Sequence, residues 1–298
     1  MERVSYGVWP NCCRLANGQI EVVATTDVGP RIIRLAFLGG ENEFAELPEM
    51  VMQTGGRAWH IYGGHRLWHS PEAMPRSYSP DDSPIEARTD GDTLRLIQPV
   101  EPQTGIQKEM AVALSPAEAR VRVTHRLRNA GPWPVEMAAW ALSVMAPGGF
   151  GIAPQSQRSV PHNLLPNRVL VLWPYTDPTD PRLMLGSRYL RLRQDPERGP
   201  IKVGLDVDAG WCAHARRGHL FLKRFAYQDG ARYPDCGCSV EMYTNEAMLE
   251  LETLGPLRTV APGETIEHVE EWRLFRDVDV SDEGSVERNV LPLVEAVV

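Results

Sequence analysis

The segment Trp59–Glu72 concentrates side chains that could do chemistry. It holds three histidines, one arginine and two tryptophans around the glycine pair Gly63-Gly64. Aromatic faces beside hydrogen-bonding tips suit a sugar, whose C–H faces stack on rings while its hydroxyls need donors and acceptors. We therefore expect a substrate loop here. Its expected residues are His65, as a catalytic group, and His60, Arg66, Trp68 and Glu72, as substrate-binding groups.

The alternative for this segment is a tight turn with surface histidines and a tryptophan packed as a lid. That interpretation is favoured for His60 and His69, because the sequence identifies no partner for either imidazole.

A pair of glutamates, Glu250 and Glu252, forms the second candidate. On a strand, Leu249 and Leu251 would face one side and both glutamates the other. Two carboxylates on one face can raise each other's pKa, which suits a general acid or base. A solvated outer face is the alternative, and the pattern alone favours it. Glu241, on the strand upstream, is a substrate-binding candidate with the same alternative.

Three further features carry less weight. Tyr175 could supply an aromatic wall to a cleft, although a turn at a strand end explains it equally well. Lys223 alternates with apolar neighbours and is a candidate for contact with the substrate. Cys236 and Cys238 have only one residue between them and no second pair, so buried thiols are favoured over zinc. Without a phosphate loop, dinucleotide fingerprint or nucleophile elbow, we expect neither cofactor nor metal.

The elements that would position these residues are strands. Between Ala119 and Arg128, apolar residues and His125 alternate with arginines and a threonine, which predicts a half-buried strand with a cationic outer face. The same pattern recurs along the chain, separated by turn signals such as Asn17-Gly18. The pattern predicts strands over 20–24, 31–38, 107–114, 168–173, 189–193, 201–207, 219–225, 239–244, 248–254 and 265–274. We therefore expect an all-β protein, a large antiparallel sandwich, with one domain over residues 1–298.

Composition narrows the function classes. Acidic residues outnumber basic ones by 39 to 31, and the net charge is -8, which disfavours nucleic-acid and anionic-membrane partners. The most apolar run, Met137–Ala146, is about half the ~20 residues that span a bilayer. The five cysteines form no disulfide framework and the first residues resemble no secretion signal, so we expect a reduced, cytoplasmic protein.

Several segments, in order along the chain, resemble the galactose-mutarotase-like (aldose 1-epimerase-like) superfamily. Asn17–Ile32 is similar to its opening strands, and Tyr62–His65 to its His-Gly-Gly substrate loop. Val240–Asn245 followed by Leu251–Thr253 resembles its Tyr-Thr-Gly and Leu-Glu-Thr strands, and Leu257–Phe275 fits its closing segment. The resemblance implies a β-supersandwich with a sugar site.

The resemblance also implies roles. Glu252 corresponds to the family's general base, which removes the anomeric hydroxyl proton while a histidine protonates the ring oxygen. Here the matching strand, Val135–Leu142, contains no histidine, and Trp140 stands in the place of the acid. His65 follows the glycine pair rather than preceding it. We therefore expect Glu252 and His65 to converge across one hollow, with His65 or His60 replacing the missing acid.

Three functions remain open. The first is a carbohydrate-active, epimerase-like isomerase that acts on a sugar or sugar derivative in a cleft of the sandwich. The second is a non-catalytic carbohydrate-binding or sensing module, favoured by the missing strand histidine. The third is a lyase for acidic sugars, in which Arg66 or Lys223 neutralises a uronate carboxylate.

Overall fold

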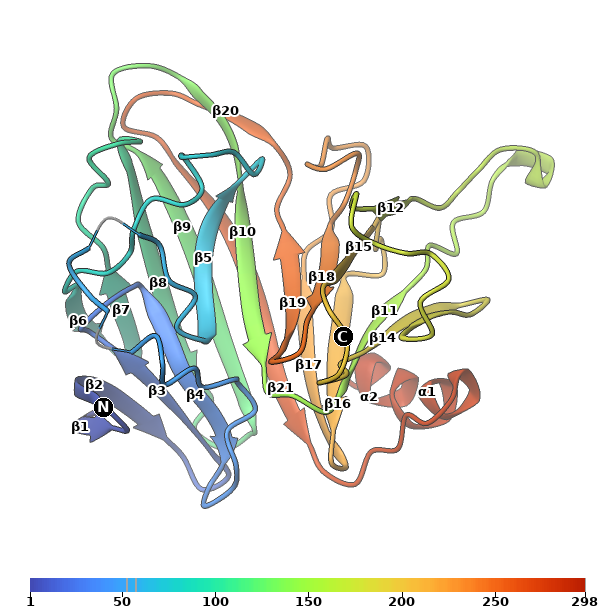
Figure 1. Ribbon diagram of the computed structural model, residues 1–298, viewed down its shortest axis with the longest axis horizontal. Helices are drawn as coiled ribbons and strands as arrows, with labels where there is room; N and C mark the ends of the chain where they lie inside the picture. The colour runs from blue at the N-terminus through green and yellow to red at the C-terminus, as the bar shows by residue number, and fades with distance from the viewer. Residues whose placement is uncertain (52, 57, 298) are drawn as a thin grey trace.

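Two large antiparallel sheets make up the molecule (Figure 1). The computed structural model describes residues 1–51, 53–56 and 58–297. Within these residues, the first sheet has 11 strands and the second has 10. The prediction of an all-β antiparallel sandwich is confirmed.

The first sheet contains, from one edge to the other, β1 (Glu2–Tyr6), β2 (Trp9–Ala16), β3 (Ile20–Thr25), β4 (Arg31–Phe37), β5 (Gly64–Ser70), β10 (Val135–Met145), β19 (Leu249–Leu254), β18 (Val240–Thr244), β15 (Ile201–Leu205) and β12 (Leu170–Leu172), with β20 (Arg258–Val260) also paired to β10. The second sheet contains β13 (Leu183–Leu185), β14 (Tyr189–Arg193), β11 (Phe150–Pro154), β16 (Trp211–Arg216), β17 (His219–Phe225), β21 (Thr265–Phe275), β9 (Arg120–Asn129), β8 (Ile106–Leu114), β7 (Thr93–Ile97) and β6 (Glu86–Asp90).

The alternation in the sequence appears directly as burial. In β9, Val121, Val123, His125 and Leu127 are buried, and the residues between them are exposed or half-buried. Side chains of this kind from both sheets form one continuous apolar core between the layers. Each strand predicted from alternation has a counterpart among the strands of the structure.

The segment after the glycine pair is a strand rather than a loop, so that expectation is wrong. β5 lies between β4 and β10, and all seven of its residues are buried. Gly64 has φ +71, and a Cβ there would lie 2.3 Å from the carbonyl oxygen of Ile32, so this close approach requires glycine. A strand covered on both faces loses the polar–apolar alternation that would have revealed it.

The helical elements are short. The 3-10 turn η1 (Pro161–Asn163) lies on an extended loop, and α1 (Glu283–Asn289) and α2 (Leu291–Glu295) follow β21. Val286 and Val290 pack with Trp211 in a second apolar cluster on the second sheet. In the described part of the chain, no helix has both the length and the apolar character needed to cross a membrane.

Candidate functional site

The central strands of the first sheet carry a row of polar side chains on the face directed away from the second sheet. In the antiparallel register, Arg66 on β5 is opposite Leu142 on β10, which is opposite Glu252 on β19, which is opposite Glu241 on β18. Residues directly opposite one another on paired strands share a face. Arg66, Glu252 and Glu241 therefore lie on one face of the sheet.

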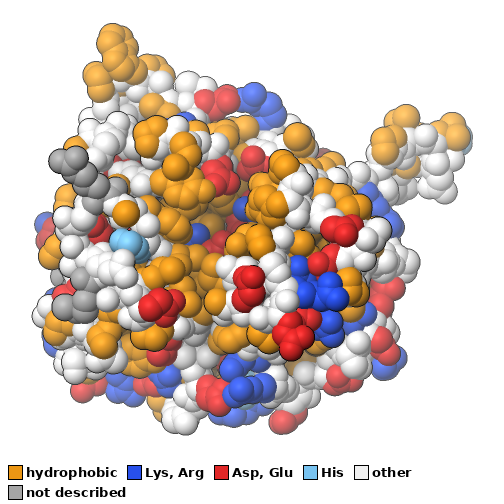
Figure 2. Space-filling model, viewed as in Figure 1, with side chains coloured by type: hydrophobic (Ala, Val, Ile, Leu, Met, Phe, Trp, Pro, Cys, Tyr) orange, Lys and Arg blue, Asp and Glu red, His pale blue; other side chains and the backbone are white. Residues whose placement is uncertain are grey.

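A cleft of about 230 Å³ opens on this face. It is lined by Trp59, Ile61, Arg66, Trp68, Glu72, Tyr78, Trp140, Leu142, Tyr175, Lys202, Tyr243, Met248 and Glu250. Figure 2 shows the hollowed middle of the molecule, where hydrophobic side chains predominate around a few charged ones. The cleft therefore combines aromatic walls with charged groups at its floor.

Lys202 forms the centre of the charged floor. Its Nζ lies 2.7 Å from a carboxylate oxygen of Glu241 and 3.0 Å from Oε2 of Glu252. The same Oε2 accepts a hydrogen bond of 2.7 Å from the indole Nε1–H of Trp140. The ammonium also lies over two aromatic faces, 4.6 Å from the ring centre of Trp140 and 4.8 Å from that of Trp173.

These contacts shift the protonation equilibria of the three groups. Burial raises the pKa of Glu241 well above its usual value, although Lys202 opposes the shift. Burial also raises the pKa of Glu252, while Lys202 and the Trp140 hydrogen bond lower it in part. For Lys202, burial lowers the pKa, but the two carboxylates outweigh it and raise the pKa well above its usual value. We infer that Lys202 is protonated and that Glu252, rather than Glu241, carries the negative charge that balances it. A protonated Lys202 cannot act as an amine nucleophile.

A second ion pair forms part of the aromatic wall. Arg66 Nη1 lies 2.8 Å from Oε1 of Glu250, and its guanidinium lies 5.2 Å from the ring centre of Trp59 and 4.8 Å from that of Trp68. The rings of Trp59, Trp68 and Tyr78 contact one another edge to face, with centroids 4.9 to 5.6 Å apart. The indole nitrogens of Trp59 and Trp68 are buried and have no hydrogen-bond partner within the described residues.

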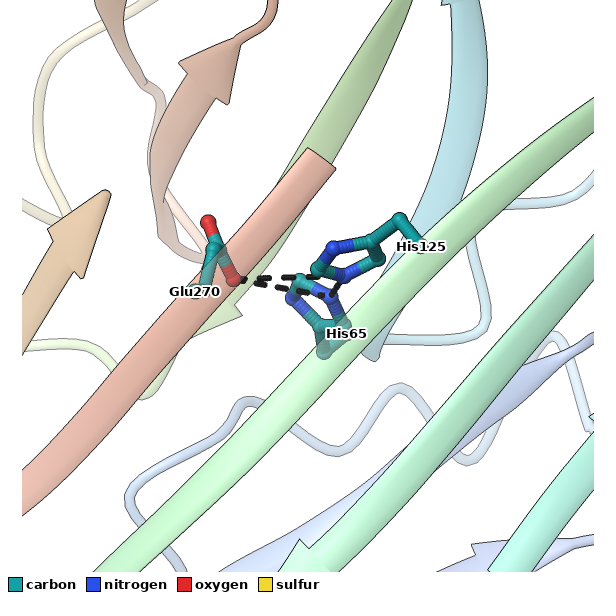
Figure 3. Close-up of side chains that lie close together, drawn as sticks. All are labelled: His65, His125 and Glu270. Atoms are coloured by element: carbon teal, nitrogen blue, oxygen red, sulfur yellow. Dashed lines mark hydrogen bonds and ion pairs between the residues drawn. The ribbon is translucent and has the colours of Figure 1, made fainter. Parts of the chain in front are cut away.

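His65 does not belong to this cleft, and its expected convergence with Glu252 is wrong. It lies one residue before Arg66 on β5 and pairs with Ser143 on β10, so its side chain is directed to the opposite face, between the sheets. There its Nδ1 lies 2.8 Å from Ser143 Oγ and its Nε2 lies 2.7 Å from Nε2 of His125 (Figure 3). Burial lowers the pKa of His65 well below its usual value, which keeps the imidazole neutral.

The same interior cluster brings three metal-type donors together. Donor atoms of His65, His125 and Glu270 lie within 4.8 Å of one another (Figure 3). The Glu270 carboxylate is already bound by Lys223 at 2.8 Å and by the Trp272 indole at 2.7 Å. The two facing imidazole nitrogens, 2.7 Å apart, are closer than two tetrahedral zinc ligands, which lie about 3.3 Å apart at bond lengths near 2.05 Å. The cluster is satisfied as a hydrogen-bonded network in the core.

The remaining predicted residues divide between the cleft and other regions. Trp68 lies in the wall, Glu72 and Tyr175 also line the cleft, and Glu241 lies at the charged floor. Lys223, on β17, is fully buried between the sheets, so the expectation that it contacts substrate is wrong.

His60 is half-buried and packs against Tyr62, with ring centres 5.7 Å apart, and it does not line the cleft. Neither His60 nor His65 therefore lines the cleft.

Sequence reasoning missed Lys202, Tyr78 and Tyr243, and it placed Trp59 in the expected loop without naming it as a binding residue. Lys202 lies within a predicted strand and is paired with Tyr243 on β18. A lone lysine in an apolar strand was a signal, but its partners come from strands far away in the sequence.

No family model and no curated protein matches the chain. Among solved structures, a protein of Synechocystis sp. superposes with a TM-score of 0.61 at 12% identity, covering 93% of this chain and 99% of the other. A galactose mutarotase-like protein of Lactobacillus casei gives 0.58 at 10% identity, covering 89% and 100%. A galactose mutarotase related enzyme of Lactobacillus acidophilus gives 0.55 at 9%, covering 90% and 98%.

These likenesses define the class of fold. The chain has the galactose mutarotase-like sandwich fold, and the resemblance noted in the sequence is confirmed at that level. At such identities the likeness extends to the fold alone, and the activity has to be argued from the cleft.

Proposed function

We propose that the protein binds a carbohydrate in the cleft over β5, β10, β19, β18 and β15. The single observation that carries the proposal is the combination of an aromatic wall with unpartnered hydrogen-bonding groups in one cleft of about 230 Å³. Sugar rings present apolar C–H faces to aromatic rings, and their hydroxyls both donate and accept hydrogen bonds. The buried indole nitrogen of Trp68 would donate to such a hydroxyl, and the unpartnered Glu252 Oε1 would accept from one that reaches it.

Binding without turnover is the favoured form of this function. Mutarotation needs one group to remove a proton and another to supply one across the ring, each worth about 10²–10⁴ in rate. Glu252 offers the base, but it is fully buried and held by Lys202 and Trp140. The imidazoles of His60 and His65 lie outside the cleft, so neither supplies the acid.

An epimerase-like reaction is the second candidate. The raised pKa of Glu252 and its free Oε1 favour it. Catalysis would require a sugar hydroxyl to reach Oε1, because Lys202 and Trp140 already occupy Oε2. The ammonium of Lys202, beside this carboxylate, would be a candidate proton donor, although its raised pKa makes it a weak acid.

Elimination on acidic sugars receives less support. Lys223 is buried between the sheets, and Arg66 is paired with Glu250 and stacked on two indoles. Among the described residues that line the cleft, each cation already has a carboxylate partner.

Ligand-observed NMR with single-anomer aldoses tests both forms at once. We expect saturation transfer to the sugar and no acceleration of anomer exchange. Tyr175→Ala, at the half-exposed rim, should weaken binding, whereas Trp133→Ala, an exposed indole that does not line the cleft, should not. Exchange that is accelerated by the wild type and lost in Glu252→Gln would establish the epimerase instead. If no sugar shows saturation transfer, the carbohydrate proposal fails.

A further inference from the structure

The charges of the cleft contain information about the ligand's own charge. The two cations, Arg66 and Lys202, are each neutralised by carboxylates of the protein. Arg66 faces Glu250, and Lys202 faces Glu252 with Glu241 beneath it. An anionic ligand would have to displace one of these buried pairs, which leaves a carboxylate unpaired in a poorly solvated place.

Glu72 is the carboxylate without a cation. It lines the cleft, is exposed, and accepts a hydrogen bond from the hydroxyl of Tyr78. No cation of the described chain lies within ion-pair distance of it. With Glu241 protonated, the cleft and its floor hold three carboxylates, Glu72, Glu250 and Glu252, and two cations, Arg66 and Lys202. One negative charge is therefore left uncompensated.

Aromatic rings share the cleft with this uncompensated charge. Tyr78, Tyr175 and Trp59 line the same cleft as Glu72. Burial, together with Glu72 itself, raises the pKa of Tyr78 to about 12, so its hydroxyl stays protonated and donates to the carboxylate. A carboxylate beside aromatic faces is the setting in which proteins bind ammonium groups, through an ion pair and cation–π attraction together.

We propose that the ligand is an amino sugar with a free ammonium group, received by Glu72 at the rim of the cleft while the sugar ring lies along the aromatic wall. This inference rests on the proposed carbohydrate cleft and specifies its ligand. It also separates the site from one for uronic acids or sugar phosphates, because those ligands would need the cations that the protein has already paired. Glu72 then determines specificity.

Isothermal titration of the intact protein with matched sugars tests the proposal. The panel contains glucosamine, galactosamine and mannosamine, each with its N-acetyl derivative and parent aldose, and also glucuronate. We expect the free amine of at least one series to bind about fivefold more tightly than both of its neutral counterparts, the preference that a partly exposed ion pair supports. We also expect that preference to shrink in high salt and glucuronate to bind most weakly.

Two variants with the same change in net charge test whether Glu72 causes the preference for the free amine. In Glu72→Gln, the ratio of amine to N-acetyl affinity should fall to about one. In Glu49→Gln, which makes the same change in net charge at an exposed position outside the cleft, the ratio should be retained. Neutral sugars that bind as well as their amines, or glucuronate that binds more tightly, would overturn this inference and leave the carbohydrate cleft in place. Absence of binding across the whole panel would overturn both proposals.

Discussion

Replacing Lys202 with methionine should make the stability of the protein strongly dependent on pH. The ammonium lies 2.7 Å from Glu241 and 3.0 Å from Glu252, and both carboxylates are fully buried. Methionine keeps the length of the side chain and removes the charge. Removing one partner of a buried ion pair typically costs about 3–5 kcal/mol, because the remaining charge stays buried without compensation.

The sign of the pH dependence follows from the two carboxyl groups. Without Lys202, burial and mutual repulsion hold the folded-state pKa of Glu241 and Glu252 above the unfolded value near 4.5. Groups with a raised pKa in the folded state contribute stability that is fully present below about pH 4.5 and is lost as the pH rises through the folded-state pKa. The variant should therefore lose about 3–5 kcal/mol at pH 8 and much less at about pH 5.

Urea unfolding followed by tryptophan fluorescence measures this difference. Wild type and Lys202→Met are compared at about pH 5 and about pH 8, and an unchanged slope with denaturant shows that the same transition is observed. Arg217→Met, at an exposed surface pair with Glu41, should change stability by less than about 1 kcal/mol at either pH. If Lys202→Met lowers the free energy of unfolding equally at the two pH values, Lys202 does not balance the charge of buried carboxylates, and the interpretation of the floor is refuted.

Three further predictions concern other parts of the molecule. Burial raises the pKa of Glu101, but Lys108 and neighbouring hydrogen bonds outweigh it and lower it to about 2. Its contribution of about 3 kcal/mol should be lost as the pH falls from about 4.5 to about 2, and this loss should disappear in Lys108→Met, as measured by urea midpoints. Gly64→Ala should lower the free energy of unfolding by about 3 kcal/mol, against about 1 kcal/mol for Gly91→Ala, whose added Cβ meets no atom within 4 Å. His65→Ala should cost about 2–4 kcal/mol in unfolding experiments yet keep sugar affinity within about twofold, and a large loss of affinity would contradict its place in the core.

Much of the fold could be predicted because alternation is a local signal. Strands such as β9 bury one face and expose the other, so apolar and polar residues alternate along their sequences. The central strands β5 and β10 could not be recognised in the same way, since both of their faces are covered and nearly all of their residues are buried. The polar residues of β5 then look like those of a loop.

The site could be predicted only in part because the period of a strand is two residues. Arg66 and Trp68, two residues apart on β5, face the cleft, whereas His65, one residue before Arg66, is directed to the opposite face and into the core. The sequence does not reveal the register in which neighbouring strands pair, so the face on which each of these side chains lies could not be assigned. Lys202 was missed for a related reason, as its two carboxylate partners come from strands 39 and 50 residues further along the chain.

The most direct test of the sugar cleft is a crystal structure of the protein soaked with an amino sugar such as glucosamine. We expect a sugar ring against Trp59 and Trp68, one hydroxyl within hydrogen-bond distance of the Trp68 indole nitrogen, and the ammonium beside Glu72. A sugar bound anywhere else on the molecule, with this cleft empty at saturating concentration, would contradict this expectation.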